Sequence, residues 1–232
     1  MILKQISRAI KHSLWLLVAT KELSAQEIES IGRVDVVEGT VEVIRFDGTR
    51  LLLNKGDNVY KNDTILTSNN GSVGITFIDN TIFSLSGNGK MVIDDLVYDS
   101  TLHEGKFSSN IVVGLFSFIS GEIAKSSPEG MTIKTPVATL GIRGTKIAGK
   151  ASEEGSENTI SLLPEVDRQG NVLVGELMIN NAGGAVVLNQ VGETVKLTSS
   201  LQSPPVPTVY SQQEIQQSFG ETLTTLSTTV VE

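Results

Sequence analysis

The charged residue with the most unusual setting in this sequence is Arg143, which stands between Gly141 and Gly144. An arginine carries five N–H donors in a planar fork that fits a carboxylate or a phosphate. The two glycines predict a tight backbone turn, because glycine adopts positive φ without strain. Two interpretations stay open: a buried or half-buried guanidinium that ties the turn to carbonyls or a carboxylate, or a cation displayed to an acidic ligand or partner peptide.

Residue types that usually perform catalysis or bind metals are scattered elsewhere. His12 and His103 lie on unrelated segments, so they predict neither a metal cluster nor a Ser–His pair. Asp94 and Asp95 precede Asp99, but no EF-hand accompanies them, and neighbouring strand positions point to opposite faces. The absence of cysteine excludes a thiolate site and a disulfide. We therefore expect no catalytic residue, no metal and no cofactor.

The segment that must position Arg143 has the pattern of short strands. Residues 131–135 alternate between polar and apolar, and Pro136 then interrupts the ladder because it has no N–H to donate. Residues 137–140 restart an extended run, and residues 145–148 form another after the glycines. The candidate contact motif comprises Thr135, Pro136, Gly141, Arg143, Gly144 and Thr145.

Composition favours a β protein that does not bind nucleic acid. The 232 residues are 39% hydrophobic and 5% aromatic and include 22 glycines, which suits short strands joined by glycine turns. A formal charge of −8 argues against binding to nucleic acid or to an anionic membrane surface. No apolar run approaches the length of a membrane-spanning helix, so we expect no transmembrane segment.

Residues 33–200 predict one all-β domain. Strand patterns recur between turn formers such as Asn69-Asn70-Gly71 and Gly87-Asn88-Gly89, and Asp79-Asn80 reads as a two-residue hairpin loop. Many short strands of this kind suit a rolled sheet, a sandwich or a β-solenoid-like stack, with short helices confined to the two ends.

An internal repeat supports this organisation. Residues 39–59 match residues 175–195 at a shift of 136, sharing Gly-x-φ-x-φ, a turn glycine (Gly48 and Gly184) and a second glycine before an acid (Gly56 and Gly192), where φ is apolar. The glycines predict hairpin turns with positive φ. A weaker echo of the pattern begins at Gly121.

The two ends have a different character. Residues 1–32 read either as an amphipathic helix over residues 2–23 or as a secretory signal with a short apolar region. Residues 201–232 read as a Pro-rich linker followed by a short amphipathic helix that begins with the Ser211–Glu214 capping box and docks on the sheet. Residues 224–232 are expected to fray.

Several motifs together resemble the FecR domain family: Leu52–Asp57, Asn62–Thr67, Gly71–Asn80, Met91–Tyr98 and Thr135–Thr145. Members named for the iron-citrate regulator lie in the bacterial envelope and carry a signal from an outer-membrane receptor to a sigma factor. This sequence lacks their cytoplasmic helical domain and membrane segment, so it looks like a stand-alone form of the domain.

The resemblance implies a non-enzymatic protein of the cell envelope, periplasmic or at the cell surface. Such a protein would bind a protein partner or take part in signalling. The alternative is a structural or adhesive surface or secreted component. A carbohydrate-active β-solenoid enzyme ranks last, because no cluster of acidic and basic residues stands out in the sequence.

Overall fold

A long hairpin forms the centre of the computed structural model, which describes residues 29–127, 129–166 and 169–231. Its strands are β7 (Ile82–Asp99) and β8 (Glu104–Ile119), and each contributes to two layers of strands. The first half of β7 pairs with β6 (Ser72–Phe77), and the second half pairs with β5 (Thr64–Thr67). The two halves of β7 therefore belong to different layers of strands.

Strand β8 divides between the two layers in the same way. The second half of β8 pairs with β11 (Lys146–Ala151), and its first half pairs in parallel with β9 (Met131–Lys134). One layer, here called the helix-side layer, continues through β1 (Gly32–Glu38), β4 (Asn58–Val59), β12 (Asn158–Leu163), β17 (Glu193–Leu197) and β18 (Thr208–Val209). The other, here called the open layer, continues through β2 (Val41–Ile44), β3 (Arg50–Leu52), β10 (Thr139–Arg143), β15 (Glu176–Asn181) and β16 (Gly184–Leu188).

Glycines allow the hairpin to pass from one layer to the other. In β7 the register shifts between Ser86 and Lys90, where Gly87 has φ +43°. In β8, Gly114 has φ +120°, and a Cβ atom there would lie 2.6 Å from the Cα of Gly89. The sequence predicted a turn at residues 87–89 that separates two strands. That prediction is wrong, because the glycines form a corner within one continuous strand.

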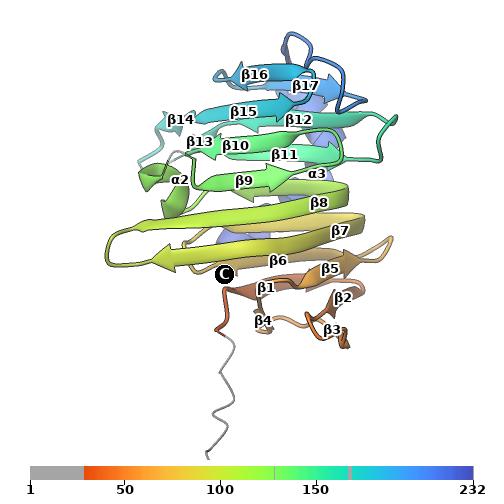
Figure 1. Cartoon of the computed structure of the whole chain (residues 1–232), viewed down its shortest axis with the longest axis vertical. Helices are drawn as coiled ribbons and strands as arrows, with labels where there is room; N and C mark the ends of the chain where they lie inside the picture. The colour runs from red at the N-terminus through yellow and green to blue at the C-terminus, as the bar shows by residue number, and fades with distance from the viewer. Residues whose placement is uncertain (1–28, 128, 167–168, 232) are drawn as a thin grey trace, which may run out of the picture.

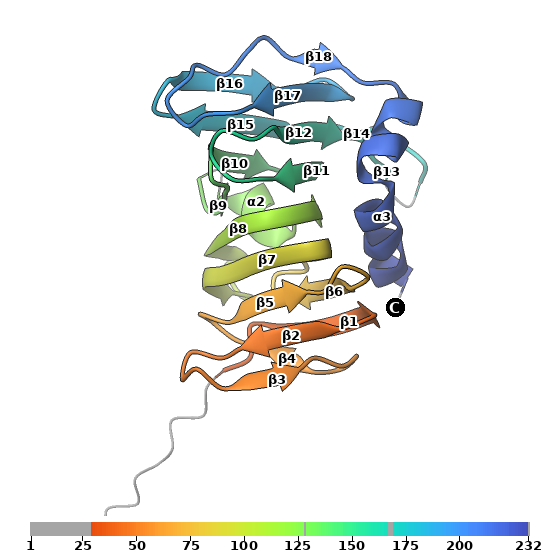
Figure 2. The ribbon, with the colours of Figure 1, turned by 90° about the vertical axis from the view of Figure 1, so that its right-hand side faces the viewer.

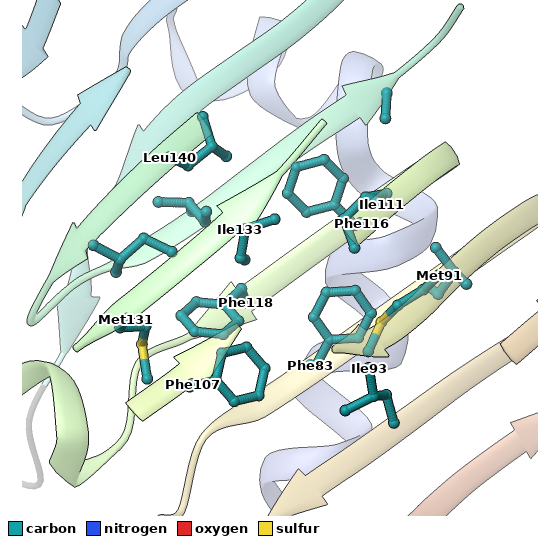
Figure 3. Close-up of a cluster of buried hydrophobic side chains, with 14 of the residues drawn as sticks. Phe83, Met91, Ile93, Phe107, Ile111, Phe116, Phe118, Met131, Ile133 and Leu140 are labelled. Carbon is teal, nitrogen blue, oxygen red and sulfur yellow. The ribbon is translucent and has the colours of Figure 1, made fainter. Parts of the chain in front are cut away.

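The inner faces of the two layers enclose an aromatic core (Figure 3). Phe107 of the open layer lies 5.0 Å from Phe77 and 6.0 Å from Phe118, both on the helix-side layer, measured between ring centroids. Phe83 stacks on Phe116 at 6.5 Å. These rings join the layers, since each large buried aromatic side chain removes much apolar surface from water. The predicted all-β class, with many strands in a rolled sheet, a sandwich or a β-solenoid-like stack, is confirmed: most strands form one large sheet that folds into two layers.

Helix α3 (Gln212–Val231) packs along the outer face of the helix-side layer (Figure 2). It begins with the predicted capping box, in which the Ser211 N–H donates to the Glu214 carboxylate over 2.7 Å. The predicted fraying from residue 224 is wrong, because the helix continues to Val231. Its threonines are the reason: Thr222, Thr225 and Thr229 are buried against the sheet.

Small residues beneath α3 let the helix approach the strands closely. Ser84 and Ser117 face each other across β7 and β8, and the Thr222 hydroxyl lies 2.7 Å from the Ser84 hydroxyl. Gly74 in β6 lies under Thr229. A hydroxyl network of this kind satisfies polar atoms that would otherwise be costly to bury.

A short helix, α2 (Glu122–Ser126), lies beside β8 at one edge of the stack (Figure 1). Its Ile123 and Ala124 are buried in the main core. Two predictions fail here, because helix is not confined to the ends of the chain and the weak repeat echo from Gly121 is no strand. The small hairpin β13 (Glu165–Val166) and β14 (Val172–Leu173) stands apart from the main sheet.

The turn glycines predicted from the repeat are confirmed. Gly48, Gly184, Gly56 and Gly192 have φ values of +85°, +146°, +93° and +82°. Gly56 and Gly192 are the third residues of two β-turns, and positive φ at the third residue is typical of type II. The acidic residue after each glycine accepts a hydrogen bond from the first residue of the turn. Asp57 accepts the Asn54 N–H over 2.8 Å, and Glu193 accepts the Gln190 N–H over 3.0 Å.

The loop between β6 and β7 differs slightly from its prediction. Ile78 leaves the ladder, so the loop has three residues rather than two, and Asn80 takes φ +63° as its last residue. The Phe77 N–H still donates to the Thr81 carbonyl over 2.8 Å. The predicted N-terminal helix or signal falls outside the described residues.

Candidate binding site at the Arg143 turn

Two turns position the candidate motif between β9, β10 and β11. In the first, the Thr135 N–H donates to the Ala138 carbonyl over 2.8 Å, and the Ala138 N–H donates to the Thr135 hydroxyl over 3.1 Å. Pro136 follows Thr135, where its fixed φ suits a turn and its missing N–H costs no ladder bond. Thr135 and Pro136 thus reverse the chain between β9 and β10.

The second turn carries the chain from the open layer to the helix-side layer. Gly144 has φ +58°, so a side chain at this position would be strained. Thr145 is buried, and its N–H donates to the Ser120 hydroxyl over 2.8 Å. Gly141 does not belong to this turn, contrary to prediction. It lies inside β10, opposite Thr132 on one side and Met178 on the other.

Arg143 ends β10 with an exposed side chain. The expectation of a buried or half-buried arginine that holds the turn together is wrong. Within the described part of the chain its guanidinium has no hydrogen bond or ion pair, although Glu176 stands opposite it in the ladder. The cation is therefore available to a group from outside the chain.

The structural role expected for Arg143 belongs to Arg45 instead. The Arg45 guanidinium pairs with the buried Asp63 carboxylate and donates to the Asn58 carbonyl over 3.2 Å. It also lies over the Tyr60 ring, 4.9 Å from the centroid. No sequence signal separates these two arginines. Arg45 directly follows a short strand and Arg143 ends one, and each lies next to a glycine-containing turn.

A shallow hollow of about 320 Å³ surrounds Arg143 on the outer face of the open layer. Its floor includes Gly141, where an added Cβ would find the nearest atom, Met178 Cε, at 3.7 Å. Helix α3 lies on the opposite side of the stack (Figure 2), so no described helix covers this face. The lining side chains come from Glu129, Met131, Thr132, Thr139, Arg143, Glu176, Met178 and Asn180.

The other residues considered for chemistry are held by neighbours. Asp94 lies 3.6 Å from the Lys134 ammonium, and Asp95 lies 2.7 Å from that of Lys61. A β-bulge between Ile93 and Asp95 breaks the strand alternation assumed for the two aspartates. Among residues 29–127, 129–166 and 169–231, no group of three histidine, cysteine or acidic side chains could hold a metal ion.

His103 belongs to the turn between β7 and β8. It has φ +55°, and its Nδ1 lies 3.1 Å from the hydroxyl of Tyr98. His12 lies outside the described residues. The two histidines therefore give no support for a shared site.

Comparison with protein families decides what the central part of the chain is. Residues 63–164 match the model of the family described as FecR protein. The central part of the chain is therefore similar to a FecR domain. The matched region runs from the start of β5 to the end of β12, so it contains the long hairpin and the whole Arg143 motif. The recognition made from the sequence motifs is confirmed.

Two solved structures were compared with the chain. One, a cell surface anchoring domain, is 32% identical, with 27% of this chain and 82% of that chain covered and a TM-score of 0.26. The other is a candidate anti-sigma factor from Parabacteroides distasonis, 13% identical, with 66% and 62% covered and a TM-score of 0.48. Both scores are too low to support an argument about function. The chain spans less than two thirds of the second protein, and no curated protein matches it.

Proposed function

We propose that this FecR-domain protein is a non-enzymatic binding module of the cell envelope. It recognises a protein partner through the hollow at Arg143. The observation that carries this proposal is an exposed guanidinium, without an intramolecular partner among the described residues, in a hollow on the open layer. An acidic side chain or a C-terminal carboxylate of the partner would pair with the planar fork.

The architecture supports binding rather than catalysis. Ladder bonds hold β10 between β9 and β15 as far as Gly141, and Arg143 itself pairs with Glu176 of β15. A rigid sheet surface lowers the entropy that binding must overcome. None of the described helices is both long and apolar enough to cross a bilayer. A place in the periplasm or at the cell surface is part of the proposal and follows from the FecR resemblance.

Affinity purification from envelope fractions tests the proposal with matched variants. Arg143→Ala removes the cation, and Gly141→Thr adds a side chain to the floor of the hollow, where a Cβ atom would lie 3.7 Å from Met178 Cε. The control is Arg50→Ala, which removes an exposed arginine of the same layer at the other end of the stack. A partner found with the wild type and with Arg50→Ala should be lost with the other two. Equal recovery with Arg143→Ala would contradict the proposal.

A further inference from the structure

A second hollow lies between α3 and the helix-side layer, on the opposite side of the stack from Arg143. Its volume is about 440 Å³, which is in the range of small-molecule sites. Residues of β11, of β12 with the loop that follows it, and of the loop before β17 form one wall, and residues of α3 form the other. The apolar lining consists of Leu163, Pro164, Val191, Ile215 and Leu223.

Lys146 is the charged residue in this lining. It is the first residue of β11, and its side chain is half-buried. Within the described chain its ammonium has no hydrogen bond and no carboxylate within ion-pair distance. Burial lowers the pKa of Lys146, and the more distant charge of Glu165 opposes that shift. A half-buried ammonium without an acceptor is costly, and an anion placed beside it would remove that cost.

A neighbouring hollow of about 460 Å³ also borders Lys146 but has a different charge. Glu122 and Lys125 line it and pair with each other at 3.1 Å, and Glu165 adds another negative charge. The two acidic and two basic residues that line it balance each other, so it attracts an anion less than the hollow lined by Lys146 alone among charged residues. The hollow against the first half of α3 therefore suits an anionic ligand better.

We infer that the hollow at Lys146 binds a small apolar molecule with one carboxylate, such as a medium-chain fatty acid. The carboxylate pairs with the Lys146 ammonium, and the hydrocarbon lies against Leu163, Ile215 and Leu223. Charge complementarity sets the polarity of the head group, and the apolar walls set the nature of the tail. This site is separate from the Arg143 hollow and does not depend on the function proposed for it.

Calorimetric titration of the full chain with three ten-carbon probes tests the inference. Decanoate, 1-decanol and decyltrimethylammonium share a tail and differ in head-group charge, and all are used below their micelle concentrations. We expect decanoate to bind most tightly and the cationic probe most weakly. Equal binding of decanoate and the cationic probe, or no binding of decanoate, would overturn the inference.

Variants assign the head group to Lys146. Lys146→Met keeps the apolar stem and removes the charge, so decanoate should bind at least tenfold more weakly while 1-decanol changes less than twofold. Lys150→Met, at an exposed lysine of the same strand, is the matched control and should leave decanoate binding unchanged. Ile215→Trp should fill the hollow and weaken both probes. Unchanged decanoate affinity in Lys146→Met would refute the assignment.

Discussion

Gly74 provides a direct test of how α3 packs on the helix-side layer. A Cβ atom at this position would lie 1.8 Å from the Thr229 hydroxyl oxygen. A carbon and an oxygen atom that are not bonded need well over 3 Å between them. The helix must therefore move away by about 1.5 Å, or Thr229 must adopt another rotamer. We expect Gly74→Ala to lower the free energy of unfolding by about 1–3 kcal/mol, the usual cost of overpacking.

A second substitution should relieve most of the clash, leaving only the Cβ atom of residue 229 close to the new methyl group, at 3.0 Å. Thr229→Ala removes the hydroxyl that meets the new methyl group. That hydroxyl otherwise donates to the Thr225 carbonyl one turn earlier in the helix, over 2.8 Å. Alone, this change should cost about 1 kcal/mol, from the lost methyl burial. The double variant should be more stable than the sum of the single effects by about 0.5–3 kcal/mol.

Urea unfolding of the four proteins at a constant m-value measures these terms. Gly141→Ala is the matched control, because it adds a methyl group to another strand glycine whose Cβ would have 3.7 Å of free space. It should change stability by less than about 0.5 kcal/mol. If Gly74→Ala is as harmless as the control, or if Thr229→Ala gives no rescue, the second half of α3 does not pack as described.

Further predictions concern the arginines, a buried carboxyl and the hairpin corner. Arg143→Ala should leave the urea midpoint unchanged, whereas Arg45→Ala should cost about 1–3 kcal/mol because it leaves a buried carboxylate unpaired; similar midpoints for both would contradict the assigned roles. Burial raises the pKa of Asp79, so the unfolded chain ionises first and stability falls as pH rises through the folded value. Asp79→Asn should therefore gain stability relative to wild type as pH rises above the ordinary pKa of an aspartate, and parallel pH curves would argue against this. Gly114→Ala should cost more than 1 kcal/mol in thermal unfolding, since a Cβ there meets backbone at 2.6 Å with φ at +120°.

Local sequence signals predicted the turns well, because glycine and the acid after it act within a few residues. Gly56 and Gly192 could be identified as turn positions from the repeat alone, and the structure gives both positive φ. The turn at Tyr60–Asp63 was missed, since Asn62 takes the place of glycine there with φ +66°. A glycine with positive φ can form a corner within a strand as well as a loop between two strands. The corner at Gly87 was therefore read as the end of a strand.

Features that depend on distant segments could not be predicted. The threonines of α3 gave no amphipathic signal, but they are buried because Ser84 and Gly74 leave room for them. The exposure of Arg143 depends on which face α3 covers, and nothing near residue 143 encodes that choice. The sequence around Lys146 did not indicate a binding site, because the hollow exists only where α3 packs against β11.

Because synthesis begins at the N-terminus, α3 is made after all the strands that it covers. Ser84 and the residue that covers it, Thr222, are separated by 138 positions. A ribosome adding about 5–20 residues per second needs roughly 7–28 s to travel that distance. Once Leu163 has been made, the apolar surface that includes Ala148 and Leu163 stays uncovered until Phe219 of α3 has also been made. During this period a chaperone or another copy of the chain could bind the surface that α3 later covers.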